Sequence, residues 1–309
     1  MSAILLATHG GESADGAARV AALLARRLGV PLHAVAVMQP AMLIGDGYSD
    51  TYVATADDIA AIKAALLDAV TAQLGRCGVH GCEPVLRIGV AASEIASVAQ
   101  ALGASLIVIG LGSHRIVDRA LGGETALHLA QVAATPVLAV PADATAIPRR
   151  AIVALDFSPT SLLAARTVAR WLEPGDALHL VHVAAPKEFG RRARAAANHD
   201  DSGVARLAQA AASLRVATNA GIDAAQISGD PARVLLERAG ELDADLIALG
   251  SHGYGIWKRL LLGSVASKII RLSPLAVLVA PIGSLVTLGG AEAPLGSRSS
   301  AGTPASPVA

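Results

Sequence analysis

The chain has 309 residues, with 25 lysines and arginines balanced by 25 aspartates and glutamates, so its formal net charge is zero. At roughly 100–200 residues per domain, this length predicts two domains. A neutral chain with 2% aromatic residues argues against a general nucleic-acid binder, which needs basic charge and stacking surfaces.

The charge is divided unevenly along the chain. Residues 1–148 carry 8 basic and 12 acidic side chains, whereas residues 149–309 carry 17 basic and 13 acidic ones. The first part is therefore net −4 and the second net +4. If one half binds an anion, this difference favours the second half.

Local features argue against several other classes of protein. Cys77 and Cys82 are the only cysteines, and they predict neither a disulfide framework nor a zinc site. The N-terminal stretch MSAILLATHGG lacks the basic region and the long apolar run of a signal peptide. The uncharged stretch 272–291 is long enough to span a membrane, but its prolines and glycines predict a strand followed by a loop. We therefore expect a cytoplasmic protein without membrane contact.

Apolar runs typical of strands alternate with helical patterns through both halves. In the first half the expected strands lie near residues 3–7, 32–37, 84–88, 105–109 and 136–140. In the second half they lie at 151–155, 176–183, 224–228, 245–250 and 276–281. The intervening helices of the second half are expected to start at Ser158-Pro159, in the alanine-rich region before Gly221, at Asp230-Pro231 and at residue 264.

The two halves are similar in sequence. Residues 89–141 align without a gap with residues 229–281, and 16 of these 53 positions are identical. The starts also match, as AILLATHGG against AIVALDFSP. We predict an α/β fold of two tandem, doubly wound domains, 1–143 and 150–283, each a parallel sheet with helices on both faces, followed by a disordered tail, 284–309.

Ligands of such sheets bind beyond the carboxyl ends of the strands. In the second half the loop after the fourth strand reads GSHGYGIWKRLLLGSVASKII, which places Gly250, Gly253, Gly263 and Ser264 in the pattern G-x2-G-x9-G-S. Gly263-Ser264 lies where the last helix should begin, and free amides at a helix start favour an anion. The loop matches neither a Walker A motif nor a dinucleotide fingerprint. A purely structural glycine turn remains the alternative.

An acidic residue, Asp156, follows the first strand of the second half. Its carboxylate could accept hydrogen bonds from an adenine amino group or a ribose hydroxyl. The alternative is that Asp156 caps the next helix.

Both halves resemble domains of the universal stress protein family. The resemblance rests on Asp156, on the turn Gly229-Asp230-Pro231, on ADLIALGSHG (244–253) and on the glycine pattern above. It implies a five-stranded sheet of order 3-2-1-4-5 and ATP as the ligand, with or without Mg²⁺. Carried over by position, the ATP contacts are Asp156, Val183, Gly250, Gly253, Gly263, Ser264 and Val265. Because dimers of the family often pair through the last strand, the two halves are expected to pair that way within the chain.

The first half departs from the family pattern. Thr8 stands in place of the acid, Ser113 in place of the second glycine, and Glu124 in place of the serine. A carboxylate expected at a helix start would repel a phosphate. We therefore expect the first half to keep the fold and to lack ATP.

Three functions follow from these features. The first, and favoured one, is a nucleotide-binding regulatory protein of the stress response, acting with a regulatory protein partner and compatible with a homodimer. The second is slow ATP hydrolysis or phosphoryl transfer, with His252 or Asp156 as the base. The third is a protein-interaction module that binds no nucleotide.

Overall fold

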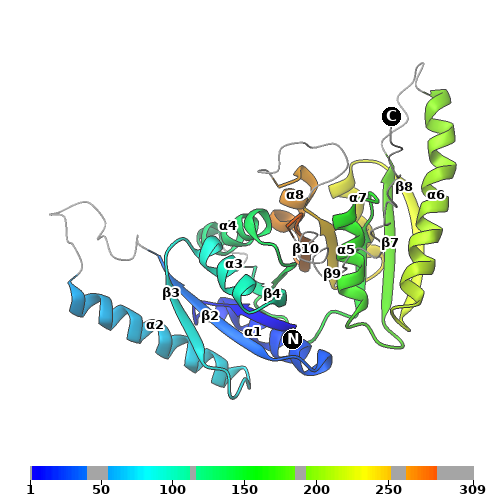
Figure 1. The fold of residues 1–309 in the computed structure, drawn as a ribbon. Coiled ribbons are helices and arrows are strands. Elements are labelled where there is room, and N and C mark those ends of the chain that lie inside the picture. The colour runs from blue at the N-terminus through cyan, green and yellow to red at the C-terminus, as the bar shows by residue number, and fades with distance from the viewer. Residues whose placement is uncertain (1, 40–54, 112–115, 185–192, 252–261, 284–309) are drawn as a thin grey trace, which may run out of the picture.

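The computed structural model describes residues 2–39, 55–111, 116–184, 193–251 and 262–283 (Figure 1). For residues 116–123 and 193–202 the backbone alone is described. The segment predicted to be a disordered tail, 284–309, lies outside the described residues.

Strands and helices alternate in the first half, as the sequence predicts. A short 3-10 helix (Glu12–Ala14) precedes the first α-helix. The elements are β1 (Ala3–Ala7), α1 (Asp15–Leu28), β2 (Leu32–Met38), α2 (Ala56–Arg76), β3 (Pro84–Ile88), α3 (Ala91–Ala101), β4 (Ala104–Gly110), α4 (Ile116–Val132) and β5 (Val137–Val140).

The second half repeats this alternation. Its elements are β6 (Arg150–Ala154), α5 (Pro159–Ala169), β7 (Ala177–Ala184), α6 (Ala193–Arg215), β8 (Gly221–Ser228), α7 (Pro231–Glu241), β9 (Leu246–Gly250), α8 (Ser264–Leu272) and β10 (Ala276–Ala280). The predicted start of the last helix is confirmed, and the predicted strands agree with the observed ones to within a few residues.

Capping side chains explain where several helices begin. Thr55 and Asp58 form a reciprocal capping box at the start of α2. Ser158 accepts a hydrogen bond from the Ser161 amide before α5, and Asp230 accepts one from the Arg233 amide before α7. Both of these caps are followed by a proline, whose fixed φ suits the first helical position.

All ten strands of the described residues belong to one sheet, in the order β3-β2-β1-β4-β5-β10-β9-β6-β7-β8. Within each half the strands are parallel, and each half has the order 3-2-1-4-5 that the family resemblance implies. The fold class predicted from the sequence is therefore confirmed.

The two halves join through an antiparallel pairing of their last strands. Leu138 pairs with Leu278, which occupies the same position in the repeat. On either side, Val137 pairs with Val279 and Ala139 with Val277, so the contact has the form of a symmetric dimer interface. The predicted pairing of the two halves through their last strands is confirmed.

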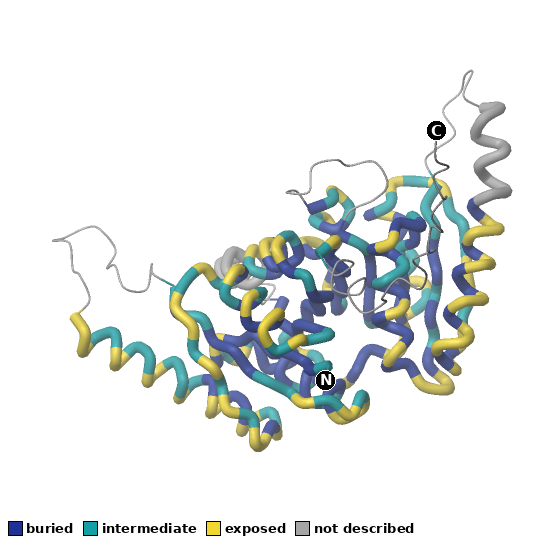
Figure 2. Tube along the Cα trace, in the orientation of Figure 1, coloured by how far each residue is buried: buried dark blue, intermediate teal, exposed yellow. Residues whose placement is uncertain are grey.

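The core lies on both faces of this continuous sheet and extends through both halves (Figure 2). On one face, α1, α2, α5 and α6 cover residues such as Leu6, Leu138 and Leu278. On the other face, α3, α4, α7 and α8 cover residues such as Ile107 and Ile152. The strands read as continuous apolar runs because both of their faces are buried.

The connector between the halves is fastened to the second half. Asp245 accepts hydrogen bonds from the Arg149 and Arg150 amides, each at 2.9 Å, and Trp171 Nε1 donates to Pro148 O at 3.2 Å. Burial raises the pKa of Asp245, and the two amides partly oppose this effect by stabilising the carboxylate.

One side chain of the first half also reaches this region. Arg27, on α1, donates to Trp171 O at 3.1 Å and lies 3.3 Å from a carboxylate oxygen of Glu173. Contacts between the halves therefore extend beyond the paired strands. The exact limits of the two domains, 1–143 and 150–283, remain a prediction.

Shortening a side chain at the paired strands should destabilise both halves. Leu138 is fully buried, so Leu138→Ala should lower the free energy of unfolding by about 2–5 kcal/mol. Trp171 and Trp257, the two tryptophans, both lie in the second half. The urea midpoint measured by tryptophan fluorescence should therefore fall, although the substitution is in the first half.

Val132→Ala is the control for this experiment, because Val132 is 54% exposed and its truncation should change stability by less than about 0.5 kcal/mol. If circular dichroism showed a loss of stability while the fluorescence midpoint of Leu138→Ala stayed unchanged, the two halves would unfold independently and the prediction would be wrong.

Candidate functional site

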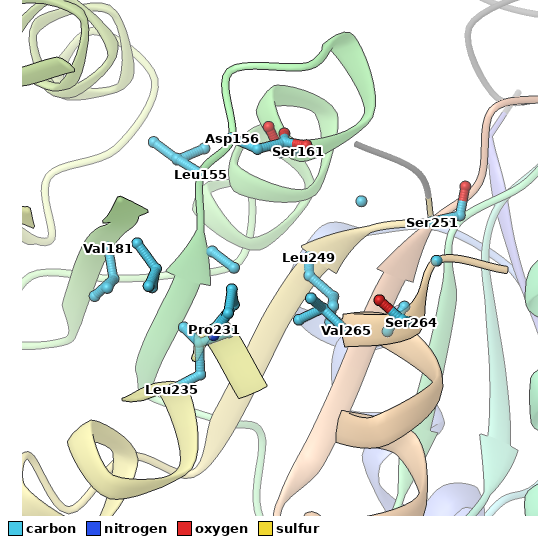
Figure 3. A pocket seen from close by; sticks show the side chains of 15 residues that line it. Leu155, Asp156, Ser161, Val181, Pro231, Leu235, Leu249, Ser251, Ser264 and Val265 are labelled. Atoms are coloured by element: carbon cyan, nitrogen blue, oxygen red, sulfur yellow. The ribbon is translucent and has the colours of Figure 1, made fainter. Parts of the chain in front are cut away.

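A pocket of about 240 Å³ opens at the carboxyl ends of β6, β7 and β9 in the second half (Figure 3). This is the edge of a parallel sheet at which ligands are expected. Its described lining residues are Ala154, Leu155, Asp156, Ser161, Val181, Val183, Pro231, Leu235, Leu249, Gly250, Ser251, Gly263, Ser264, Val265 and Ala266.

The structure brings together most of the residues that the sequence marked as a site. Six of them line this pocket, although they come from four separate segments of the chain: Asp156, Val183, Gly250, Gly263, Ser264 and Val265. Gly253, predicted with them, and His252, considered as a base, lie outside the described residues.

Sequence reasoning named Val183 and Val265 but missed the rest of the apolar lining, including Val181, Leu235 and Leu249. Val181 and Val183 alternate along β7 and so face the same side of the sheet, where Leu235 of α7 and Leu249 of β9 also contribute. The alternation of side chains along the predicted strand already indicated that Val181 and Val183 face the same side of the sheet. What could not be read from the sequence was which face of the sheet α7 covers.

Asp156 supports the start of α5 without being its cap. Its Oδ1 accepts a hydrogen bond from the Ser158 amide at 2.9 Å, while Ser158 Oγ itself caps the helix. Within the described part of the chain, Oδ2 of Asp156 has no hydrogen-bond partner. One carboxylate oxygen at the pocket therefore remains able to accept a hydrogen bond from a ligand.

Three helices begin at this pocket, as shown by the lining residues Ser161 of α5, Pro231 of α7 and Ser264 of α8. The starts of α5 and α7 are capped by side chains, whereas the residue before α8 is Gly263, which has no side chain to cap the helix. The first amides of α8, at the positive end of its dipole, are thus the ones available to an anion.

Gly250 is explained by packing. A Cβ at this position would lie 2.8 Å from the Ser161 amide nitrogen and even closer to Thr160 Oγ1, so a larger residue would collide with the start of α5. At Gly110, its equivalent in the first half, a Cβ would be less crowded, at 3.2 Å from Ser13 O and 3.3 Å from Ala14 Cα. The sequence-based reason, room for a ligand, is therefore not needed for Gly250, although the residue does line the pocket.

In the first half the corresponding position after β1 is filled by the protein's own side chains. Thr8 Oγ1 donates to Gln73 Oε1 at 2.6 Å and accepts from the Gly10 amide at 3.2 Å. Gln73, from α2, is fully buried and also donates to Gly11 O. Thr8 is therefore part of an internal polar contact.

The expectation that Glu124 stands at a helix start is wrong. The helix α4 begins at Ile116, eight residues before Glu124, whereas α8 begins at Ser264, the equivalent of Glu124. Inside a helix each amide donates to the carbonyl four residues earlier. The amides that α8 leaves open at its start are thus used within α4. Ser113, also expected to differ from the family pattern, lies outside the described residues.

The described residues contain no group of three or more His, Cys, Asp or Glu side chains that could hold a metal ion. They also contain no helix that is both long and apolar enough to cross a membrane.

Comparison with solved structures shows the same fold over nearly the whole chain. A universal stress protein from Archaeoglobus fulgidus superposes with a TM-score of 0.62 at 19% identity, covering 90% of this chain and 96% of the other. A protein of unknown function from Pseudomonas aeruginosa PAO1 gives a TM-score of 0.58 at 17% identity, with coverages of 93% and 95%. No curated protein matches the sequence at a significant level.

The model of the universal stress protein family matches the chain twice, at residues 1–141 and 148–281. These two matches coincide with the two halves of the ten-stranded sheet. The chain therefore belongs to the universal stress protein family and contains two domains of that family in tandem.

Proposed function

We propose that this protein is an ATP-binding regulatory protein of the universal stress response, with the nucleotide held by the second half and the first half serving a structural role. The observation that carries the proposal is the start of α8 at Gly263, which has no side-chain cap and opens on a pocket that also contains Asp156.

The lining of the pocket suits the parts of a nucleotide. Apolar side chains such as Val183, Leu235 and Leu249 can pack on a base, while Asp156 can accept a hydrogen bond from the base or the ribose. The amides and the exposed hydroxyl of Ser264, at the start of α8, can hold phosphate oxygens. Figure 3 places Asp156 and Ser264 on different sides of the pocket, as a ligand with two distinct ends requires.

Charge and local structure support a single nucleotide per chain. The second half carries the positive excess, whereas the first half is net negative. In the first half, Thr8 is engaged by Gln73, and Glu124 lies inside α4. The groups that can bind a ligand in the second half are thus occupied, in the first half, by contacts within the protein.

Binding is favoured over turnover by the composition of the lining. Among its described residues, Asp156 is the one titratable side chain, and part of its carboxylate already supports the start of α5. General acid–base catalysis needs a positioned group with a suitable pKa near the reacting atoms. We propose a regulatory role in the cytoplasm, where ATP with or without Mg²⁺ orders the loops of the pocket for a protein partner.

A carboxylate placed at the start of α8 should weaken ATP binding. Ser264→Glu keeps a residue that is favourable at a helix start, but it would repel a phosphate about 4 Å away by roughly 1–4 kcal/mol. We expect the dissociation constant for ATP, measured by isothermal titration calorimetry, to rise by about tenfold or more. An unchanged dissociation constant would reject this assignment of the site.

The reverse substitution in the first half should not create a second site. Glu124→Ser removes the negative charge, but the amides around it remain inside α4. We expect the same titration to give one ATP per chain for both the unmodified protein and this variant. Two ATP molecules bound by the variant would show that the charge of Glu124 alone prevents ATP binding in the first half.

Turnover distinguishes the proposed role from an enzyme. We expect purified protein that binds Mg-ATP to release phosphate no faster than a sample of Ser264→Glu under the same conditions. Phosphate release that depends on an intact Ser264 would favour slow ATP hydrolysis.

A further inference from the structure

Phe157, immediately after Asp156, has a backbone conformation that is unfavourable for its type. Its φ is 64°, in the left-handed region. Among the described residues, Phe157 and Asp243 are the two non-glycine residues with positive φ. A bulky side chain in this region is strained and persists only where its surroundings hold it.

Two side chains hold Phe157 in place. Its ring lies 4.7 Å from the ring of His182, and the guanidinium carbon of Arg206, on α6, lies 4.2 Å from its centre. His182 Nδ1 is also 2.6 Å from Leu155 O, so it can donate a hydrogen bond to the residue before Asp156. Phe157 is buried by these contacts. We refer to Phe157, His182 and Arg206 together as the aromatic clamp.

The aromatic clamp and the pocket share two backbone segments. Leu155 and Asp156 line the pocket, and Phe157 follows them directly. On β7, His182 lies between Val181 and Val183, which both line the pocket. Because alternate residues of a strand face opposite sides of the sheet, His182 faces away from the pocket, toward the face covered by α6.

In the first half the left-handed residue of the corresponding turn lies one position later and is a glycine. It is Gly10, with φ of 85°, and glycine adopts this conformation at no steric cost. His9 occupies the position of Phe157 and is exposed. The strained aromatic residue is therefore confined to the half that has the pocket.

We propose that Phe157 is a positioning residue, which holds Asp156 toward the pocket and connects nucleotide binding to the packing of α6 through Arg206. This proposal rests on the proposed ATP site. A ligand that fixes Asp156 also fixes Phe157, and the ring then holds Arg206 and the part of α6 that follows it. Nucleotide binding would in this way be transmitted to a helix on the opposite face of the sheet.

The test uses the full chain with ATP as the probe, and it compares Arg206→Gln with Arg215→Gln. Both arginines are exposed on α6, so both variants should fold. Hydrogen exchange of the peptide covering residues 203–215 is measured with and without ATP, and ATP affinity is measured by calorimetry. In the unmodified protein and in Arg215→Gln, ATP should slow exchange in this peptide.

Arg206→Gln should abolish this protection and weaken ATP binding on the order of threefold, whereas Arg206→Lys, which keeps a cation over the ring, should restore both. Phe157→Gly should also remove the protection, while Phe157→Tyr should keep it.

The outcomes separate the two proposals. If ATP binds and still protects α6 in Arg206→Gln and Phe157→Gly, the aromatic clamp is ordinary packing, and only the positioning role is overturned. If the unmodified protein binds no ATP, the proposed function fails, and the positioning role is overturned with it.

Discussion

The hydrogen bonds between β5 and β10 are the contact on which the rest of the architecture depends. Each of these strands would otherwise be the buried, apolar edge of a five-stranded sheet, with unpaired backbone groups. Their pairing turns two repeats into one sheet and leaves β3 and β8 as its outer edges (Figure 1). The symmetric register at Leu138 and Leu278 means that one chain contains an interface of the kind that two identical chains would form.

Within this shared frame the two halves differ where a ligand would bind. A Cβ at Gly250 would collide with the start of α5, and a Cβ at Gly110 would lie 3.2 Å from Ser13 O, so both glycines allow close packing against the segment that follows the first strand of their half. The equivalents Glu124 and Ser264, in contrast, lie in the middle of one helix and at the start of the other. The repeat therefore keeps the residues that pack the sheet and changes those that leave backbone amides open.

Strain is also distributed unequally between the halves. The turn after β1 uses Gly10, whereas the turn after β6 uses Phe157 in a conformation that its neighbours must hold. A residue of this kind ties the backbone of the pocket to the helix packed behind it. The physical difference between the two halves thus lies in a few backbone positions.

The sequence by itself determined the repeat, the alternation of parallel strands and helices within each half and several residues of the pocket, because apolar runs, caps and glycines act locally. Asp156 and Ser264 could be named from their positions after a predicted strand and at the start of a predicted helix, and Val183 from the resemblance to the family. Only the tertiary structure decided that Gly250 is needed for packing, that Gln73 engages Thr8, and that α4 begins at Ile116. These three facts depend on contacts between distant segments, or on how far a helix extends, and neither is encoded in the spacing of a motif.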